Sequence, residues 1–470
     1  MINQTAKNAL ILICIVVAAF AKQPPQTNPQ TRPEVFAIID VNVVPMDRDG
    51  ILEHRTVIVR GVRIAKIEPA EHIEVPAEAT RIDGRRKYLM PGLADMHVHP
   101  ADTDELILFV ANGVTTIRNM WGFPEKHLVW REQVEKGEIV GPTLYTSGPF
   151  LDGDPPMVPG GDVVDTPDAA TQAVAKHKDA GYDFIKVLSN LRSDVYDAIV
   201  AASTAHRIRV VGHVPFSVDL DHALFSGISS IEHLTGYGFA LQREDSPVVD
   251  RSKKGALHRA WKHFDESKLR EVVEKTRQAG VWNCPTLEAW RAYLPENMEL
   301  LKERELLKYV SPSMWEWWQA DLNRPEYEEV VALVRLSMDA RRKVVNALNS
   351  GGARILLGTD AGSSGVLPGF SAHRELQMLV EAGLTPFEAI RAATVNAAEF
   401  LESGDEFGTV AVGQRADLLL IDGDPLSSVA NTTRIAGVML RGKWLPKAEL
   451  SKLLEGVAKS YEEQAAEAEK

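Results

Sequence analysis

The sequence has little cysteine, which excludes a fold held together by several disulfide bonds. Only Cys14 and Cys284 occur among the 470 residues, and Cys14 falls in an apolar N-terminal stretch typical of a signal peptide. If that stretch is removed, the mature chain keeps one cysteine and forms no internal disulfide. Its stability must then come from the hydrophobic core or from a bound ligand such as a metal.

Basic residues are too few to balance the acidic ones. The chain has 52 Lys and Arg residues against 65 Asp and Glu residues, a formal net charge of −13. This excess of negative charge argues against nucleic acid and against an anionic membrane surface as the main partner. We expect a small-molecule substrate, and the sequence leaves open whether the chain forms a homo-oligomer.

The first residues carry the features of an export signal. Lys7 supplies a positive charge, residues 9–21 are uncharged and mostly apolar, and Ala19-Phe20-Ala21 fits a cleavage site of the small-x-small type. Thirteen residues are too few to span a bilayer comfortably, so we predict a cleaved signal peptide over 1–21. The mature protein would be periplasmic or secreted, with a disordered leader over 22–34 and no stable membrane insertion. An uncleaved membrane anchor is the alternative.

Short strand-like segments separated by turns occupy both ends of the remaining chain. They cover residues 35–91 and 405–447, and neither group has enough strands to form a domain alone. We therefore predict that they pair in one small β-sandwich domain around a central insertion. Residues 448–470 read as an acidic, solvated C-terminal helix.

The central part, residues 92–404, alternates short apolar runs with amphipathic segments. Eight such runs are present, as a (β/α)8 TIM barrel requires, so the predicted fold class is α/β. The tryptophan-rich stretch at about 240–345 is longer than a barrel loop needs. It is either a lid over the barrel mouth or a set of extra helices that pack their aromatic residues outside; we slightly favour the second interpretation.

Polar residues interrupt five of the apolar runs near their C-terminal ends. They are His97, His99, Lys186, His213, His233 and Asp360. Each has an ordinary structural explanation when taken alone, but a barrel would gather all six at one rim, where barrel enzymes place their chemistry. Imidazoles crowded there without a metal would leave polar atoms unpaired. Imidazole and carboxylate ligands without a thiolate favour zinc, with manganese, iron or cobalt as alternatives.

A set of motifs extends over nearly the whole chain and resembles the amidohydrolase superfamily of metal-dependent hydrolases. The motifs are "PGLADMHVHP", "GVTTIRN", "DFIKV", "VVGHVP", "SIEHL", "GTDAG" and "GLTPFEAIRAATVNAAEFL". The sequence is most similar to the branch that contains imidazolonepropionase-like and zinc prolidase-like proteins. Imidazolonepropionases proper lack a lysine at the position of Lys186, which argues against that specific activity.

The resemblance implies a ligand set for two divalent metal ions. His97, His99 and Asp360 would hold the more buried ion, and His213 and His233 would hold the second. Lys186 would be carboxylated and bridge both, which removes the cost of burying an ammonium group. A hydroxide shared by the ions would attack the substrate, and Asp360 would transfer its proton to the leaving group.

The predicted function is hydrolysis of an amide-type C–N bond in a small dipeptide-like or acyl-amino-acid-like substrate. A lactone or ester hydrolase, a mononuclear deaminase and a non-catalytic metal-binding or ligand-binding relative are the alternatives. Weaker candidates for substrate binding are Tyr237, Arg118 and His373. Tyr237 could instead be packing, and Arg118 could pair with an internal carboxylate. His373 could orient a metal ligand or simply cap its helix.

Overall fold

The computed structural model describes residues 34–122, 126–253 and 255–468. Contacts within the chain divide it into Met1–Glu34 and Val35–Lys470. The predicted signal peptide and nearly all of the predicted leader lie outside the described residues, so both stay predictions. Every element below belongs to the unit Val35–Lys470.

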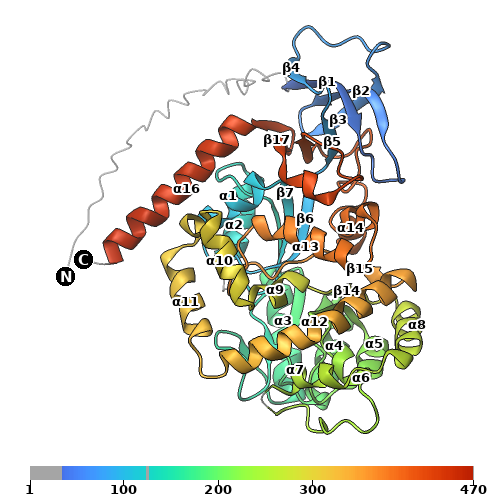
Figure 1. Ribbon diagram of the computed structural model, residues 1–470, viewed down its shortest axis with the longest axis vertical. Helices are drawn as coiled ribbons and strands as arrows, with labels where there is room; N and C mark the ends of the chain where they lie inside the picture. The colour runs from blue at the N-terminus through green and yellow to red at the C-terminus, as the bar shows by residue number, and fades with distance from the viewer. Residues whose placement is uncertain (1–33, 123–125, 254, 469–470) are drawn as a thin grey trace, which may run out of the picture. The chain divides into compact units, whose positions relative to one another are not determined.

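Strands from both ends of this unit form one sheet of eight strands, in which blue and red strands lie side by side (Figure 1). Its order is β18-β17-β16-β5-β1-β2-β3, with β4 beside β1. The strands are β1 (Val35–Val43), β2 (Leu52–Arg60), β3 (Arg63–Pro69), β4 (Thr80–Asp83), β5 (Tyr88–Pro91), β16 (Leu418–Ile421), β17 (Ile435–Leu440) and β18 (Lys443–Pro446). The predicted second β domain is therefore present and draws on both chain ends; the residue limits predicted for the domains stay predictions.

Apolar residues on both faces hold this sheet together. In β2, Val57 and Val59 pack into one apolar cluster, whereas the intervening Ile58 packs into another on the opposite face. Side chains alternate in direction along a strand, so a run of apolar residues covers both faces. The β5–β16 pair, antiparallel from Pro91 to Tyr88, joins the N-terminal strands to the C-terminal ones.

The eight runs predicted as barrel strands are all strands in the structure. They are β6 (Leu93–Val98), β7 (Val114–Asn119), β8 (Thr143–Thr146), β11 (Phe184–Val187), β12 (Arg209–Gly212), β13 (Ile228–Glu232), β14 (Trp282–Cys284) and β15 (Arg354–Ile355). Parallel bridges between Ser147 and Phe184 and between Val98 and Ala361 join the two sheets into which these strands fall. The barrel is thereby closed, and the short strands β9 (Leu151–Asp152) and β10 (Asp162–Val163) extend its sheet.

Helices surround the barrel strands, as the alternating pattern predicts. They include α1 (Thr103–Ala111), α2 (Lys126–Glu135), α3 (Pro167–Ala180), α4 (Ser193–His206), α5 (Leu220–Ser226), α8 (Leu269–Ala279), α12 (Tyr327–Ser350), α13 (Phe370–Glu381), α14 (Pro386–Ala392) and α15 (Val395–Phe400). A capping box, visible in the sequence as Thr385-Pro386-Phe387-Glu388, starts α14: the Glu388 amide donates to the Thr385 hydroxyl, and the Thr385 amide donates to the Glu388 carboxylate. These bonds satisfy amide groups that a helix start leaves unpaired.

The stretch 240–345 is not one continuous insertion, because α8 and β14 are regular barrel elements within it. The additional elements come before and after these two. They are α6 (Tyr237–Ala240), α7 (Ala256–Ala260), η1 (Trp261–His263), η2 (Glu266–Lys268), α9 (Leu287–Ala292), α10 (Pro295–Glu303), η3 (Leu306–Tyr309) and α11 (Pro312–Leu322). Helix α11 contributes Met314 and Trp317 to a cavity that His97, His99 and Asp360 also line, which supports the lid interpretation over the one we slightly favoured.

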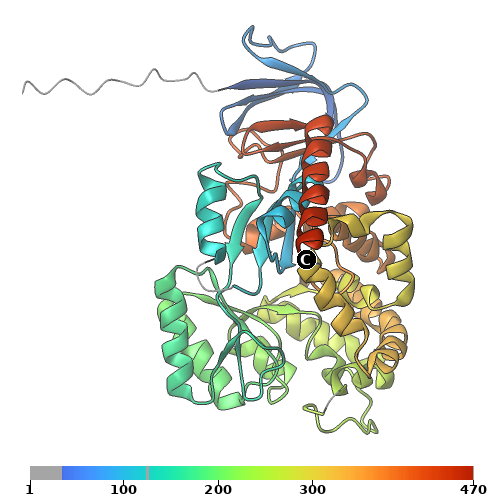
Figure 2. The same cartoon turned by 90° about the vertical axis from the view of Figure 1, so that its left-hand side faces the viewer.

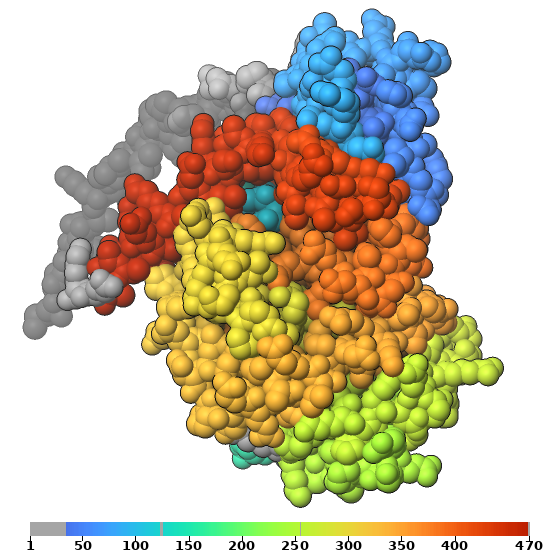
Figure 3. All heavy atoms as spheres, viewed as in Figure 1, coloured from blue at the N-terminus to red at the C-terminus, as the bar shows by residue number. Residues whose placement is uncertain are grey.

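The C-terminal helix α16 (Lys447–Ala468) is more closely packed than its acidic sequence suggests. Leu450, Val457 and Tyr461 are buried, and the Tyr461 hydroxyl donates to the Asp102 carboxylate at 3.0 Å. Figure 2 shows α16 extending from the β-sheet towards the barrel, and Figure 3 shows it beside the segment that precedes α11. Among the described helices, none is both long enough and apolar enough to cross a membrane.

Candidate metal centre

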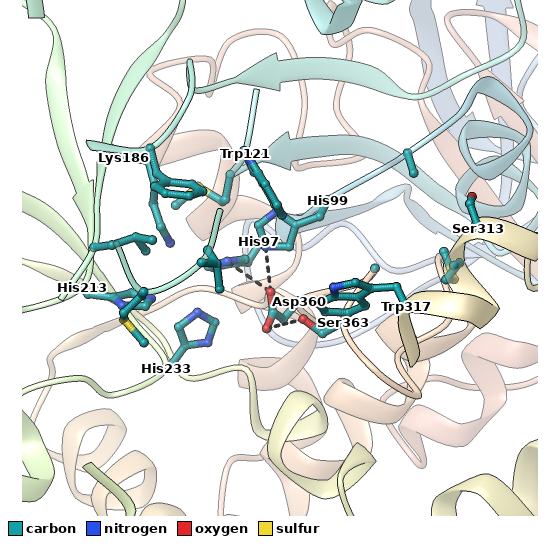
Figure 4. Close-up of a pocket in the computed structure, with 18 residues that line it drawn as sticks. His97, His99, Trp121, Lys186, His213, His233, Ser313, Trp317, Asp360 and Ser363 are labelled. Carbon is teal, nitrogen blue, oxygen red and sulfur yellow. Dashed lines mark hydrogen bonds and ion pairs between the residues drawn. The ribbon is translucent and has the colours of Figure 1, made fainter. Parts of the chain in front are cut away.

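The six residues predicted at the strand ends line a single cavity of about 360 Å³ (Figure 4). They come from five different strands or the turns that follow them, and they are His97, His99, Lys186, His213, His233 and Asp360. Parallel strands of a barrel end on one side, so residues far apart in sequence meet there. The structure therefore brings the whole predicted set together.

A buried carboxylate fixes the orientation of His97. Its Nδ1 donates to Glu232 at 2.7 Å, and the second oxygen of Glu232 accepts from Arg118 at 2.9 Å. All three side chains are buried. An imidazole that donates from one nitrogen to a carboxylate presents the lone pair of the other nitrogen, an arrangement that supports metal ligation. The Nε2 atom of His97 lies 3.4 Å from Asp360.

Two further histidines are oriented by hydroxyl groups. Nδ1 of His213 lies 2.9 Å from the Ser189 hydroxyl, and Nδ1 of His233 lies 2.6 Å from the Thr286 hydroxyl. Because Nδ1 of each ring contacts a hydroxyl group, Nε2 is the nitrogen that remains available to bind a ligand in the cavity. The His233 ring centroid is 4.5 Å from that of His97 and 5.2 Å from that of His213. Three imidazoles thus converge at one place.

Burial keeps these imidazoles uncharged. It lowers the pKa of His97 and His213 well below the ordinary value and that of His233 to about 4. The neutral form is the one that binds metal ions. Burial also lowers the pKa of Lys186 to about 8, against the opposing charges of Glu232 and Asp360. About a tenth of Lys186 is therefore a neutral amine at pH 7, far more than for an ordinary lysine.

Asp360 lies between the histidines and the cavity mouth. One carboxylate oxygen is 2.9 Å from Nε2 of His99, and the other accepts from the Ser363 hydroxyl at 2.9 Å. Burial raises the pKa of Asp360, but His233 and His99 outweigh burial and hold it below the ordinary value. Asp360 and His233 have backbone φ angles of 66° and 59°, a left-handed conformation that costs energy and is concentrated at functional sites.

The donor set fits divalent metal ions. His97, His233 and Asp360 each offer one ligand atom, and these atoms lie within 4.8 Å of one another. In the described structure, the buried Nδ1 atom of His99 has no hydrogen-bond partner. Neutral imidazoles and a carboxylate around a shared space are the ligands that zinc and similar ions prefer.

Two carboxylates that support the site were not singled out from the sequence. Glu232 orients His97, as described above, and Asp95 accepts from the Thr359 amide at 2.9 Å and the Thr359 hydroxyl at 2.6 Å. Asp95 thereby ties the segment that carries Asp360 to strand β6. Burial raises the pKa of Asp95 to about 7. Both follow period-two spacing in buried strands. Asp95 is in phase with His97 of β6 and with His99 just after it, and Glu232 is in phase with Ser230, so this spacing was the available signal.

The three weaker candidates for substrate binding do not line the cavity. The Tyr237 hydroxyl donates to Asn283 at 2.7 Å within the core. Arg118 is buried and pairs with Glu232, so its guanidinium supports His97 instead of reaching a substrate. His373 is buried on α13, with Nδ1 2.8 Å from the Thr432 hydroxyl. For Tyr237 and Arg118 the structural interpretation describes the observed contacts, whereas the contact of His373 with Thr432 is neither a helix cap nor support of a predicted metal ligand.

Gly358, which follows β15, packs so closely against Cys284 and His97 that a larger residue would not fit there. A Cβ atom on Gly358 would lie 2.3 Å from Sγ of Cys284 and 2.9 Å from Cβ of His97. We expect Gly358→Ala to displace His97, lower the content of bound divalent metal and reduce the thermal midpoint by roughly a few degrees, because overpacking costs about 1–3 kcal/mol. Gly404→Ala is the matched control, since its Cβ would meet nothing within 4 Å. Metal analysis and thermal unfolding measure both effects; an unchanged metal content in Gly358→Ala would contradict this interpretation.

Comparison with known proteins places the chain in a family. A model of the amidohydrolase family matches residues 88–445, which is most of the chain. The chain belongs to the amidohydrolase family. This confirms the predicted family and the α/β barrel with a second β domain, and it makes the protein a hydrolase. Metal dependence is general among amidohydrolases, and the cluster described above provides a group of residues able to hold an ion.

Individual relatives show the same relationship. Ochratoxinase of Aspergillus niger is 24% identical over 463 residues, covering 86% of this chain and 87% of that protein. Imidazolonepropionase of Geobacillus sp. (strain WCH70) is 37% identical over 256 residues, covering 43% of this chain and 59% of that protein. The solved structure of bottromycin amidohydrolase is 27% identical, with a TM-score of 0.73 and coverage of 93% of this chain and 94% of that one.

Proposed function

We propose that this amidohydrolase uses two divalent metal ions, zinc by preference, to hydrolyse an amide-type C–N bond in a small acylated amine or amino acid, including dipeptides. The observation that carries the proposal is the convergence of all six ligand-type residues on one cavity. His97, His99 and Asp360 would hold one ion, His213 and His233 the other, and a carboxylated Lys186 would bridge them. When bound, the ions supply Lewis acidity, which polarises a carbonyl group and acidifies water.

The chain's own residues supply positioning and proton transfer. Glu232, Ser189 and Thr286 hold the imidazoles of His97, His213 and His233 in fixed orientations. A carboxylate oxygen of Asp360 faces the same space, where it can accept a proton from the attacking water. The same oxygen can return that proton to the leaving nitrogen, as general acid–base catalysis of amide cleavage requires.

Assembly of the bridging group should depend on pH. Only the neutral Nζ amine of Lys186 adds carbon dioxide, which releases one proton and leaves a carbamate. Because burial lowers the pKa of Lys186 to about 8, the neutral fraction rises with pH, reaches about one half near pH 8 and levels off above about pH 9. Metal-stripped protein given zinc and bicarbonate should therefore regain more activity at pH 8 than at pH 6. Reconstitution that is independent of both pH and bicarbonate would contradict a carbamate.

The central test is the reaction itself. Zinc-loaded protein should cleave members of a library of dipeptides, acyl-amino acids and simple amides, with products identified by mass spectrometry. Hydrolysis of lactones or esters alone would favour an ester or lactone hydrolase, and release of ammonia from a heterocycle with one metal per chain would favour a mononuclear deaminase. Stoichiometric zinc without turnover of any compound would favour a non-catalytic relative.

The proposal includes export to the periplasm or the medium. Its support is the sequence of residues 7–21 alone, which lie outside the described part of the chain. Mass spectrometry of the purified full-length gene product should find a mature N-terminus at residue 22. A protein that starts at Met1 in the cytoplasmic fraction would contradict export.

A further inference from the structure

The outer part of the metal-site cavity is apolar and has no role in the reaction steps proposed above. Its larger side chains include Trp121, Phe150, Met157, Met314 and Trp317. Lys186, only 3% exposed, is the one lysine or arginine among the lining residues that the structure describes. Lys186 belongs to the buried metal site, so the outer wall offers no lysine or arginine, among the residues described, to pair with a charged carboxylate.

One side of this wall is an aromatic pair beside a predicted metal ligand. The rings of Trp121 and Phe150 have centroids 5.4 Å apart, and the edge-to-face contact of Trp121 with His99 has a centroid distance of 6.2 Å. Nε1 of Trp121 donates to the Gly160 carbonyl at 3.2 Å, and the Met157 amide donates to Asp152 at 2.7 Å. These bonds position the loop that carries Met157 against the cavity.

The opposite side is helix α11, which is anchored to the segment that follows Asp360. Trp318 is fully buried, and its Nε1 donates to the Gly362 carbonyl at 3.4 Å. The Ser364 hydroxyl donates to Asp321 at 2.7 Å. With Trp318 held inward, the adjacent Trp317 lies beside Asp360 and Ser363 (Figure 4).

Exposed apolar side chains gather at the mouth of this cavity. Trp317 is 48% exposed, Met157 is 42% exposed and Val158 is 38% exposed, and all three line the cavity. Water contact with large apolar groups is unfavourable, so such groups clustered at one site indicate an apolar ligand that covers them. Aromatic side chains add a preference for a flat ring, through stacked or edge-to-face contacts.

We propose that this wall binds a neutral aromatic group next to the scissile bond, so that aromatic-acyl amides without a charge on the ring are the preferred substrates. The proposal rests on the amide hydrolysis proposed above and narrows its substrate class. A carboxylate on the ring would lose its hydration against apolar side chains without gaining a basic partner, which is costly.

Two anilides that differ only in charge test this preference. They are 4-nitrophenylacetyl anilide and 4-carboxyphenylacetyl anilide, whose ring substituents are similar in shape and separated from the carbonyl by a CH₂ group. We expect kcat/KM of the zinc-loaded enzyme to be at least about tenfold higher for the nitro compound. Equal values, or a preference for the carboxylate, would overturn the proposal.

Trp317 should contribute to this selectivity. Trp317→Ala is expected to lower the ratio of kcat/KM for 4-nitrophenylacetyl anilide to that for acetanilide by about tenfold, because a large ring contact is lost. Phe225→Ala is the matched control, since Phe225 is 59% exposed on α5 and does not line the cavity. The same loss in both variants, or in neither, would count against a role of the wall.

A binding measurement separates this inference from the proposed reaction. Ketones in which CH₂ replaces the anilide nitrogen cannot be hydrolysed, and calorimetry gives their Kd with the zinc-loaded protein. We expect the nitrophenyl ketone to bind at least about tenfold more tightly than the carboxyphenyl ketone, and Trp317→Ala to weaken it selectively. If no amide is cleaved but this pattern holds, the proposed reaction fails and the aromatic site stands. Equal Kd values would reject the aromatic site whatever the reaction.

Discussion

Replacing Lys186 with alanine is expected to lower kcat/KM for amide hydrolysis by about a thousandfold or more, because metal assistance contributes several kcal/mol. The variant should also bind less zinc than the natural protein. The amine is buried and lines the cavity, and burial lowers its pKa to about 8, so that the charged form is less favoured than in water. A bridging carbamate forms directly from the neutral amine. An ammonium group with a purely structural role would instead carry the free-energy cost of burying its charge. Steady-state kinetics and metal analysis of the same preparation measure both effects.

Two further variants distinguish the bridging role from a simple loss of packing. Lys186→Glu keeps a carboxylate and is expected to retain more zinc than Lys186→Ala, whereas a structural need for positive charge predicts the reverse order. Lys302→Ala removes an exposed lysine that pairs with Glu299 and should behave like the natural protein. Full activity and full zinc content in Lys186→Ala would rule out a bridging carbamate.

Asp360→Asn is expected to lower kcat by about a thousandfold while the fold is retained. The substitution preserves the volume of the side chain but removes the negative charge and the proton acceptor at a position 2.9 Å from Nε2 of His99. Loss of a positioned acid–base group alone costs about 10²–10⁴-fold, and loss of a metal ligand adds to this. Kinetics, zinc analysis and thermal unfolding should be measured together, so that lost activity is not mistaken for lost structure.

Ser363→Ala provides a graded comparison for Asp360. It removes only the hydroxyl that donates to the second carboxylate oxygen of Asp360, at 2.9 Å. One hydrogen bond to a charged group contributes about 1.5–3 kcal/mol, so a reduction of roughly ten- to hundredfold is expected. Activity of Asp360→Asn comparable to that of Ser363→Ala would show that the carboxylate is not the proton carrier.

Sequence reasoning found the barrel and the ligand-type residues because both produce local patterns. The eight apolar runs are the eight barrel strands, and the period of two that placed His97 and His99 on one face follows from strand geometry. Buried barrel strands are otherwise apolar, so polar residues at their ends stand out in the sequence. The capping box at Thr385 and Glu388 was readable because its hydrogen bonds span only three residues.

Long-range contacts account for the parts that the sequence did not show. Glu232 supports His97 across 135 residues, and Arg118 reaches Glu232 across 114 residues, so neither pairing leaves a local pattern. The sequence around Arg118 does not distinguish an arginine that binds a substrate from one that pairs with an internal carboxylate. The packing of Trp317 at the cavity and Trp318 in the core depends on how α11 meets the segment after Asp360, which only the folded chain defines.

The measurement that tests the account most directly is a crystal structure of the zinc-loaded enzyme with anomalous data collected at the zinc edge. Two anomalous peaks are expected, one at His97, His99 and Asp360 and the other at His213 and His233. Continuous density for a carboxylate group on Nζ of Lys186 is also expected, between the two peaks. A single peak beside an unmodified Lys186, in protein that is fully active, would contradict a carbamate-bridged pair of metal ions.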